Sequence, residues 1–339
     1  MTYYRRMRLI MGSHHAVGIV NPHGGEFDSR LELINPSYVV PSPDGIFLYV
    51  VSENLTEPGS VHCLRREGER LVPHGPARPS GGEQPCHASI HPSGKYLLVA
   101  NYGSGTVAAL PIEADGVLGE PASIVAHEGS GPDKPRQNGP HAHQIITDPS
   151  GQWVLACDLG TDEVFVYRLE EATGRLAEHS AAHFVPGQGV RHIAFAPDGE
   201  RAYVVAELSS EVIVCDWDAT DGRLTPINSI STVSMDGDRV TDNYPGAVVV
   251  SRDGSRVYVT NRGHDSIAVI DGELFELIGT RPCEGEWPRD ARISPDGGTL
   301  YVANENSGAV VPFDITERVP VPIDGAVIDF PGVTSVWPL

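Results

Sequence analysis

Residues 294–304 read Ser-Pro-Asp-Gly-Gly-Thr-Leu-Tyr-Val-Ala-Asn, a tight polar turn that leads directly into an alternating apolar segment. The same arrangement occurs six times along the chain, at Pro43-Asp44-Gly45, Pro92-Ser93-Gly94, Pro149-Ser150-Gly151, Pro197-Asp198-Gly199, Arg252-Asp253-Gly254 and Pro295-Asp296-Gly297. Successive turn glycines are separated by 49, 57, 48, 55 and 43 residues. This spacing is typical of the blades of a β-propeller and is too regular for independent hairpins.

Each repeat carries at least three predicted strands. The first precedes the turn and the second follows it, as in residues 95–101 and 299–304. A third apolar segment comes after a small polar turn, as in residues 163–167 and 266–270, and a more variable fourth strand is expected on the outside. The fold class predicted from this pattern is all-β.

The two ends of the chain supply a seventh blade. Residues 8–13 and 16–20 match the second and third strands of a repeat, and residues 332–337 match a first strand. We expect the N-terminal strands and the C-terminal strand to pair, since this hides the sheet edges that each would otherwise expose. Residues 1–339 are therefore predicted to form a single seven-bladed β-propeller domain.

Composition agrees with this fold and limits the partners. The chain has 339 residues, of which 40% are hydrophobic, with 37 glycines and 28 prolines to form turns. Its formal net charge is −21, so it repels phosphate backbones and anionic lipid. Neither nucleic acid nor a membrane is an expected partner, whereas the sequence says nothing of the oligomeric state.

The cysteines and the N-terminus indicate a cytoplasmic protein. The five cysteines are widely spaced and lie in or beside apolar segments, so we expect them to be reduced and buried. Met1 to Leu9 is basic, but no long apolar segment follows it, and a secretory signal or membrane span is not expected.

Equivalent positions of the repeats form rings around the propeller axis. Six residues before each turn lies an inner ring of Ser37, Cys86, His143, Arg191, Gly246 and Arg289. The position just after the second strand gives Glu53, Tyr102, Leu159, Glu207, Arg262 and Glu305. Charged residues at such crowded positions are unusual for a purely structural role, so we expect them to line a central, water-filled funnel.

The candidate catalytic residues are His143, Glu207, Arg191 and Arg262. Guanidinium groups bind carboxylates or phosphates and can stabilise an oxyanion, while a histidine and a glutamate can transfer protons. Substrate binding is expected to involve Arg289, His141, Glu53, Tyr102 and Glu305. In the competing interpretation, the arginines and glutamates of neighbouring blades form buried ion pairs that hold the ring together.

Two further features leave alternatives open. His141 and His143 could ligate a metal with Asp158, His87 or His192, but such a pair is weak evidence and we expect neither metal nor cofactor. Strand alternation places His87 and His192 away from the inner ring, in the core. Residues 129–139 form a long loop over one face, either a surface loop or a lid.

The sequence lacks the motifs of several familiar catalytic mechanisms. It contains no Gly-x-Ser-x-Gly elbow, no P-loop and no dinucleotide-binding glycine fingerprint. A serine nucleophile and a nucleotide cofactor are therefore not expected.

The chain resembles the lactonase family of seven-bladed propellers, which includes propeller-type 6-phosphogluconolactonases and 3-carboxy-cis,cis-muconate lactonizing enzymes. The resemblance covers nearly the whole chain and rests on residues 35–38 with 48–53, 140–143 with 158–162, 190–195 with Glu207, 261–267, and 287–289. It implies that His143, Arg191, Glu207 and Arg262 form the active site. Ala206 and residues 12–15 depart from the family pattern, which affects the choice of substrate.

The leading hypothesis is hydrolysis of an anionic sugar lactone such as 6-phosphogluconolactone, without a metal. The arginines would hold the anion and polarise the carbonyl. Either Glu207 or His143 would take a proton from the attacking water, and the other would protonate the leaving ring oxygen. A second hypothesis is a cycloisomerase, or another specialised cyclase, in which a carboxylate of a muconate-like dicarboxylate adds across a double bond. A third is a non-catalytic propeller that binds a protein partner.

Overall fold

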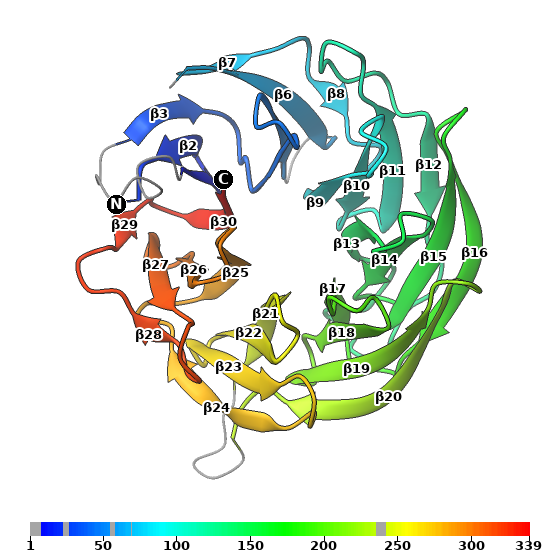
Figure 1. Ribbon diagram of the computed structural model, residues 1–339. Coiled ribbons are helices and arrows are strands. Elements are labelled where there is room, and N and C mark those ends of the chain that lie inside the picture. The colour runs from blue at the N-terminus through cyan, green and yellow to red at the C-terminus, as the bar shows by residue number, and fades with distance from the viewer. Residues whose placement is uncertain (1–7, 23–26, 55–57, 69, 235–241) are drawn as a thin grey trace.

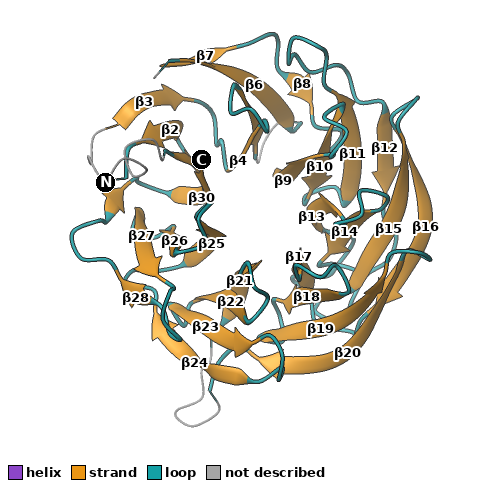
Figure 2. Ribbon diagram, in the orientation of Figure 1, coloured by secondary structure: helices purple, strands orange, loops and turns teal. Residues whose placement is uncertain are grey.

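The computed structural model describes residues 8–22, 27–54, 58–68, 70–234 and 242–339. These residues form strands, turns and loops, with no helix among them (Figure 2). The strands make seven antiparallel sheets, which Figure 1 shows as the blades of a closed ring. The predicted seven-bladed β-propeller is confirmed. Within the described residues, no helix has the length and apolar character needed to span a membrane.

Blades 1 to 4 follow one another along the chain. Blade 1 contains β4 (Tyr38–Pro41), β5 (Phe47–Ser52), β6 (Ser60–Glu67), β7 (Arg70–Pro73) and β8 (Arg78–Pro79). Blade 2 contains β9 (Pro85–Ile90), β10 (Tyr96–Asn101), β11 (Thr106–Pro111) and β12 (Ser123–Ala126). Blade 3 contains β13 (Ala142–Thr147), β14 (Val154–Asp158), β15 (Glu163–Glu170) and β16 (Arg175–His183). Blade 4 contains β17 (Val190–Phe195), β18 (Arg201–Ala206), β19 (Glu211–Asp218) and β20 (Arg223–Ser231).

Blades 5 and 6 continue this order, and blade 7 combines both ends of the chain. Blade 5 contains β21 (Tyr244–Val250), β22 (Arg256–Arg262), β23 (Ser266–Asp271) and β24 (Leu277–Pro282). Blade 6 contains β25 (Pro288–Ile293), β26 (Thr299–Asn304), β27 (Ala309–Asp314), β28 (Val321–Pro322) and β29 (Ile328–Asp329). Blade 7 contains β1 (Leu9–Ser13), β2 (Ala16–Val20), β3 (Phe27–Glu32) and β30 (Val333–Pro338).

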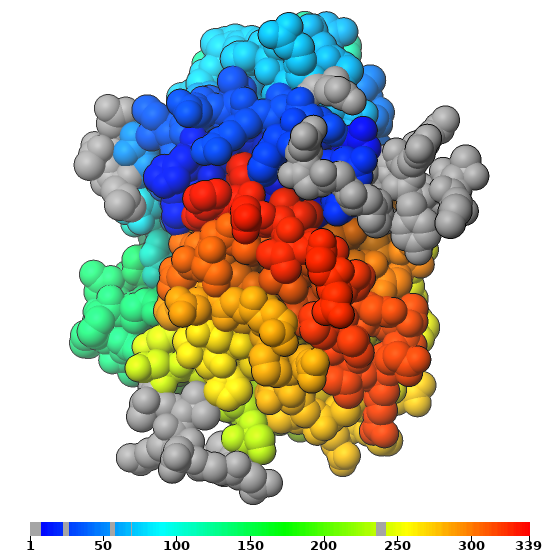
Figure 3. Space-filling view, turned by 90° about the vertical axis from the view of Figure 1, so that its left-hand side faces the viewer, coloured from blue at the N-terminus to red at the C-terminus, as the bar shows by residue number. Residues whose placement is uncertain are grey.

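Blade 7 closes the ring as predicted. Its strand order is β3-β2-β1-β30, and β1 pairs with β30 from Leu9↔Pro338 to Gly12↔Ser335. In the side view of Figure 3, the red C-terminal residues lie against the blue N-terminal ones. The facing edges of β1 and β30 are thereby paired, and every residue of β1 is buried.

The conformation of the repeated turns follows from their own residues. All six turn glycines have positive φ, between 67° and 85°, a region that favours glycine because it has no Cβ. In blade 1 the carboxylate of Asp44 accepts hydrogen bonds from the Ser42 hydroxyl, at 2.5 Å, and from the backbone N–H of Ile46, at 2.9 Å. The Asp-Gly pair therefore fixes a hairpin between the first and second strands of the blade.

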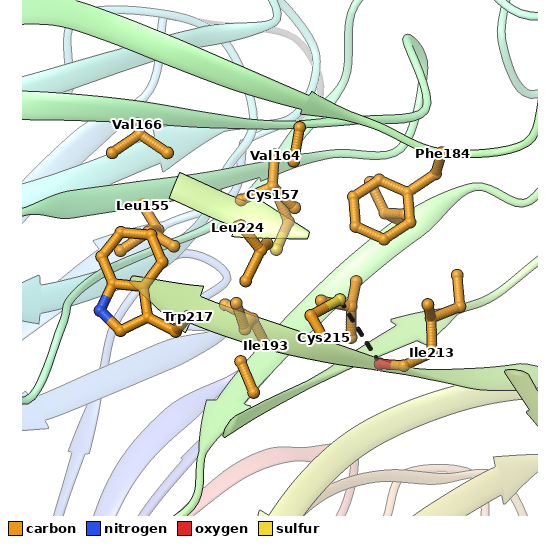
Figure 4. Close-up of a cluster of buried hydrophobic side chains, with 14 of the residues drawn as sticks. Leu155, Cys157, Val164, Val166, Phe184, Ile193, Ile213, Cys215, Trp217 and Leu224 are labelled. Atoms are coloured by element: carbon orange, nitrogen blue, oxygen red, sulfur yellow. Dashed lines mark hydrogen bonds between the residues drawn. The ribbon is translucent and has the colours of Figure 1, made fainter. Parts of the chain in front are cut away.

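The hydrophobic core lies between neighbouring blades. Figure 4 shows the cluster between blades 3 and 4, where Leu155 and Val164 of one sheet face Ile193 and Trp217 of the next. All five cysteines are buried and free, as predicted. Because each blade packs only against its two neighbours, the ring holds its innermost strands at fixed places around the axis.

A β-bulge repeats on the innermost strands. On five of these strands, all within the described residues, the register shifts at the inner-ring position counted in the sequence, at Cys86, His143, Arg191, Gly246 and Arg289. In blade 7 the same shift falls on Thr334, which completes that ring. A bulge re-aims the side chain of its extra residue, and here it directs that side chain toward the axis.

Candidate active site

The inner-ring side chains fill the centre of the propeller. Ser37, Cys86, His143, Arg191 and Arg289 line one small cavity, together with Tyr38, His192, Asp290 and Thr334. Its volume of about 10 Å³ holds about one water molecule. At this depth the long side chains that the bulges aim inward leave little free space, whereas a cavity of about 640 Å³ is lined by residues of all seven innermost strands, so the centre of the ring is open elsewhere.

Glu207 follows β18 and lies at the centre of a cluster of three arginines. Its Oε1 is 2.5 Å from Nη2 of Arg136, and its Oε2 is 2.6 Å from Nη2 of Arg262 and 3.0 Å from Nε of Arg191. Only 2% of Glu207 is exposed. We call these four residues the three-arginine cluster; it carries an excess of two positive charges.

Two of these arginines are also tied to the backbone of blade 5. Arg191 donates to the carbonyl of Gly246 at 2.6 Å, and Arg262 donates to the carbonyls of Tyr244 and Pro245 at 2.9 and 3.2 Å. The ion pairs that sequence reasoning held as its competing interpretation are therefore present between blades 4 and 5. They hold Arg191 and Arg262 in fixed positions around the Glu207 carboxylate.

The charge state of Glu207 follows from this environment. Burial by itself raises the pKa of a carboxyl group, but Arg262, Arg191 and Arg136 together lower the pKa of Glu207 to about 2. Glu207 is ionised at neutral pH and has no proton to donate. Burial and the nearby Arg262 lower the pKa of Arg191, its partner in the inner ring, to about 9. Arg191 therefore remains charged at neutral pH.

His143 occupies the bulge of β13 and is neutral. Burial, followed by Arg191, Arg289 and Arg262, lowers its pKa well below the usual value for histidine. Its Nδ1 is buried and has no hydrogen-bond partner among the described residues. The ring packs edge-on against Tyr102, at a centroid distance of 5.7 Å. A neutral imidazole with an unpaired nitrogen is suited to accept a proton.

His87 and His192 are buried, as expected, at 2% and 7% exposure. Strand alternation predicted that His192 would point away from the inner ring, and this is wrong. His192 lines the same small cavity as His143, and the centroids of the two rings are 5.1 Å apart. The bulge between Val190 and His192 causes the difference, since it breaks the period of two along β17.

His141 and Tyr102 stack at the rim of the site. Their rings lie 4.5 Å apart, and Nδ1 of His141 hydrogen-bonds to the backbone carbonyl of Tyr102 at 2.9 Å. Asp158 holds the turn below them, as its Oδ1 accepts bonds from the N–H groups of His141, Gly160 and Thr161. Across the described residues, no three His, Cys, Asp or Glu side chains are grouped to hold a metal ion.

A second cluster lies at the equivalent positions of blades 6, 7 and 1. Arg289 is 3.3 Å from Oε2 of Glu305 and 3.5 Å from Oε2 of Glu53, and His14 Nε2 is 2.7 Å from Oε1 of Glu305. We call these four residues the two-glutamate cluster. Burial raises the pKa of Glu305, but His14 and Arg289 lower it to about 2. The hydrogen bond that Nε2 of His14 donates to Glu305 raises the pKa of His14.

A polar cavity adjoins the two-glutamate cluster. Its volume is about 920 Å³, and its lining includes His14, Asn35, Asn54, Ser60 and His62. His14 Nδ1 faces Oδ1 of Asn35 at 2.8 Å, so this histidine joins the cavity to the ion pairs of the ring. Groups of this kind can hydrogen-bond to hydroxyl-rich ligands.

Sequence reasoning missed two residues of these clusters. Arg136 lies in the loop of residues 129–139, outside every repeat, and no repeat register can place it. His14 follows β1 as Glu53 follows β5 and Glu305 follows β26, so it is the seventh member of the second ring. Extending the same count to the divided blade would have found it.

Comparisons with known proteins place the chain in one family. The family model of the seven-bladed β-propeller lactonases matches residues 26–319. The chain belongs to this lactonase family. A 6-phosphogluconolactonase of Bacillus subtilis is 39% identical over 295 residues, which are 84% of this chain and 81% of the relative.

Solved structures agree with the assignment. The periplasmic gluconolactonase PpgL of Pseudomonas aeruginosa superimposes on this lactonase with a TM-score of 0.88 and 28% identity, covering 98% of this chain and 99% of the other. A protein from Lactobacillus plantarum gives a TM-score of 0.87 with 27% identity over the same shares. This lactonase is therefore an enzyme of the hydrolase class, which supports the first hypothesis over a non-catalytic propeller.

Proposed function

We propose that this lactonase hydrolyses an anionic sugar lactone such as 6-phosphogluconolactone. The observation that carries the proposal is the three-arginine cluster, an excess of two positive charges in a protein whose net charge is −21. A local positive site in an acidic protein attracts and retains an anionic substrate. The Bacillus relative that bears the name 6-phosphogluconolactonase supports the same substrate class.

In the proposed mechanism, His143 is the proton carrier. As the oxygen of a water molecule bonds to the lactone carbonyl carbon, the neutral imidazole takes a proton from the water. When the bond between that carbon and the ring oxygen breaks, the imidazolium returns the proton to the ring oxygen, which becomes a hydroxyl group. The lowered pKa of His143 keeps the imidazole neutral, and therefore competent as a base, at neutral pH.

Glu207 is the positioning residue of this mechanism. Its carboxylate holds three guanidinium groups beside one another, and the side chains of Arg262 and Arg136 are 9% and 35% exposed. The positive charge of Arg262 stabilises the oxyanion that forms on the carbonyl oxygen. None of these steps requires a metal ion.

The test measures hydrolysis of freshly prepared 6-phosphogluconolactone above its spontaneous rate. We expect the wild type to be active, a His143→Gln variant to lose at least about a hundredfold in kcat, and a His183→Gln variant to be unaffected. His183 is a matched control because its side chain is 75% exposed on β16. Activity is expected to survive treatment with EDTA.

A second substrate separates the alternatives. Turnover of 3-carboxymuconate in place of the lactone would establish the cycloisomerase hypothesis and overturn the proposal. Turnover of neither compound would exclude both activities.

We also propose a cytoplasmic location, supported by the five free cysteines, which suit a reducing compartment. Fractionation of cells that produce the protein tests this, and recovery in a secreted fraction would contradict it.

A further inference from the structure

The loop of residues 129–139 is built around one buried glutamine. Gln137 is completely buried, and its Nε2 donates to the carbonyl of Leu159 in blade 3 at 2.9 Å. Its Oε1 accepts from the N–H of Asp133 at 3.2 Å, and its own N–H donates to the carbonyl of Asp133 at 2.6 Å. The segment between these anchors includes Arg136, which is therefore presented from a defined turn.

The end of the loop is fitted closely against blade 3. At Gly160 a Cβ would lie 1.9 Å from the carbonyl oxygen of Gly139, a distance that only glycine permits. The loop thus crosses the turn that follows β14 with no space between the two backbones. This contact and the Gln137 anchor both place the loop beside the site.

Arg136 extends from this loop to a different blade. Its Nη2 binds Oε1 of Glu207, which leaves Oε2 to Arg191 and Arg262. The guanidinium group also interacts with Tyr102, the residue against which His143 packs. Arg136 therefore contacts the Glu207 carboxylate directly and is linked to the candidate base, His143, through Tyr102.

Exposure distinguishes Arg136 from the other two arginines. Its side chain is 35% exposed, whereas those of Arg191 and Arg262 are 2% and 9% exposed. The two buried arginines also donate hydrogen bonds to backbone carbonyls of blade 5. A guanidinium group has five N–H donors, so Arg136 can hold Glu207 with one edge and bind a ligand from solvent with the rest.

We propose that Arg136 forms a binding subsite for the phosphate monoester of the substrate and selects phosphorylated over unphosphorylated lactones. The inference rests on the proposed function, because it names the determinant of substrate choice at the same site. A phosphate monoester carries close to two negative charges at neutral pH, and this matches the excess charge of the three-arginine cluster. A planar guanidinium group binds such oxygens in pairs, which gives geometric selectivity.

The first experiment measures binding without catalysis. Isothermal titration calorimetry compares 6-phosphogluconate with gluconate as probes for the wild type, Arg136→Ala, Arg136→Lys and Lys134→Ala. We expect the wild type to prefer 6-phosphogluconate, Arg136→Ala to weaken its binding at least tenfold with gluconate unchanged, and Arg136→Lys to be intermediate. Lys134 lies in the same loop and is exposed, so Lys134→Ala controls for the general charge of the loop.

The second experiment measures kcat/KM for 6-phosphogluconolactone and for gluconolactone. Arg136→Ala is expected to lower the value for the phosphorylated lactone at least tenfold and to leave the other within twofold. Equal losses for both lactones, or a loss in Lys134→Ala as large as in Arg136→Ala, would overturn the subsite. Thermal unfolding of each variant verifies that the ring is intact.

The two proposals can fail separately. A wild type that hydrolyses neither lactone, but binds 6-phosphogluconate through Arg136, retains the subsite and loses the proposed function. A wild type that hydrolyses the phosphorylated lactone, with its preference unchanged in Arg136→Ala, retains the function and loses the subsite.

Discussion

The three-arginine cluster and the two-glutamate cluster occupy equivalent places in the ring and differ in charge. Glu207 and Glu305 both follow the second strand of their blades, and Arg191 and Arg289 both stand on inner-strand bulges. Around Glu207 one carboxylate meets three guanidinium groups, whereas around Arg289 one guanidinium group meets two carboxylates.

The difference shows how a repeated scaffold acquires a polarised site. The same two backbone positions hold two guanidinium groups and one carboxylate on blades 4 and 5, to which the loop adds Arg136, and one guanidinium group, two carboxylates and His14 on blades 6, 7 and 1. The bulges fix where the side chains point, and the residue types alone decide the charge. The positive potential is therefore concentrated on one side of the axis.

Replacing the glutamate at the centre of each cluster is expected to give the largest difference in stability between the two clusters. Glu207→Gln leaves three guanidinium groups without a carboxylate, and we expect the free energy of unfolding to fall by about 3–5 kcal/mol. Glu305→Gln leaves Arg289 paired with Glu53, so we expect a loss of about 1–2 kcal/mol. Urea unfolding of both variants measures the difference. Equal losses would show that the surplus of arginines has no energetic consequence.

The candidate base belongs to the cationic side, and its pH dependence tests this. Because its neighbours and burial lower the pKa of His143, we expect kcat to stay constant as the pH falls from 8 to about 6. An unperturbed histidine would instead lose half its activity near pH 6.5. A pH profile of kcat for the wild type checks this, and an acid limb near 6.5 would assign the reaction to another base.

The two clusters are expected to respond to acid in the same way, because both glutamates have a lowered pKa. Both glutamates have a pKa of about 2, below the ordinary 4.5, so each contributes stability that is complete above pH 4.5 and lost as the pH falls toward 2. The loss for Glu207 is about 3 kcal/mol across this window. Urea unfolding at pH 6, 4 and 3 should show a shallower pH dependence in Glu207→Gln and Glu305→Gln than in the wild type. A slope unchanged in Glu207→Gln would contradict the ionised state assigned here.

His14 is expected to give the smallest effect, with the opposite sign. Its pKa is raised by Glu305, so its contribution is complete below pH 6.5 and is lost as the pH rises through the raised value. Wild type and His14→Gln should differ in unfolding free energy by less than about 1 kcal/mol at pH 6 and by nothing at pH 9, since His14 is partly exposed. Urea unfolding at the two pH values measures this. A difference that grows with pH would reverse the assignment.

The repeat register predicted the fold and the inner ring because both depend on local rules. A turn glycine with positive φ and alternating apolar residues can be recognised without tertiary information, and equivalent positions then follow by counting. This is how Arg191 and Glu207 could be placed near the axis.

What could not be predicted depends on contacts between distant segments. Arg136 reaches Glu207 across 71 residues from a loop without a repeat, and no local rule gives its position. The small free volume at the inner ring depends on the summed volumes of side chains from six blades. The surroundings of His192 depend on a bulge that alternation cannot anticipate.

The closure of blade 7 has a consequence for the order of folding. The Thr334 hydroxyl bonds to the carbonyl of Gly12, a contact between residues 322 positions apart. During synthesis, β1 can pair early with β2, but its other neighbour β30 is made much later, so one edge of β1 stays unpaired for most of translation. Contacts this distant in sequence slow folding. The ring is thus an open arc on the ribosome until β30 docks against β1.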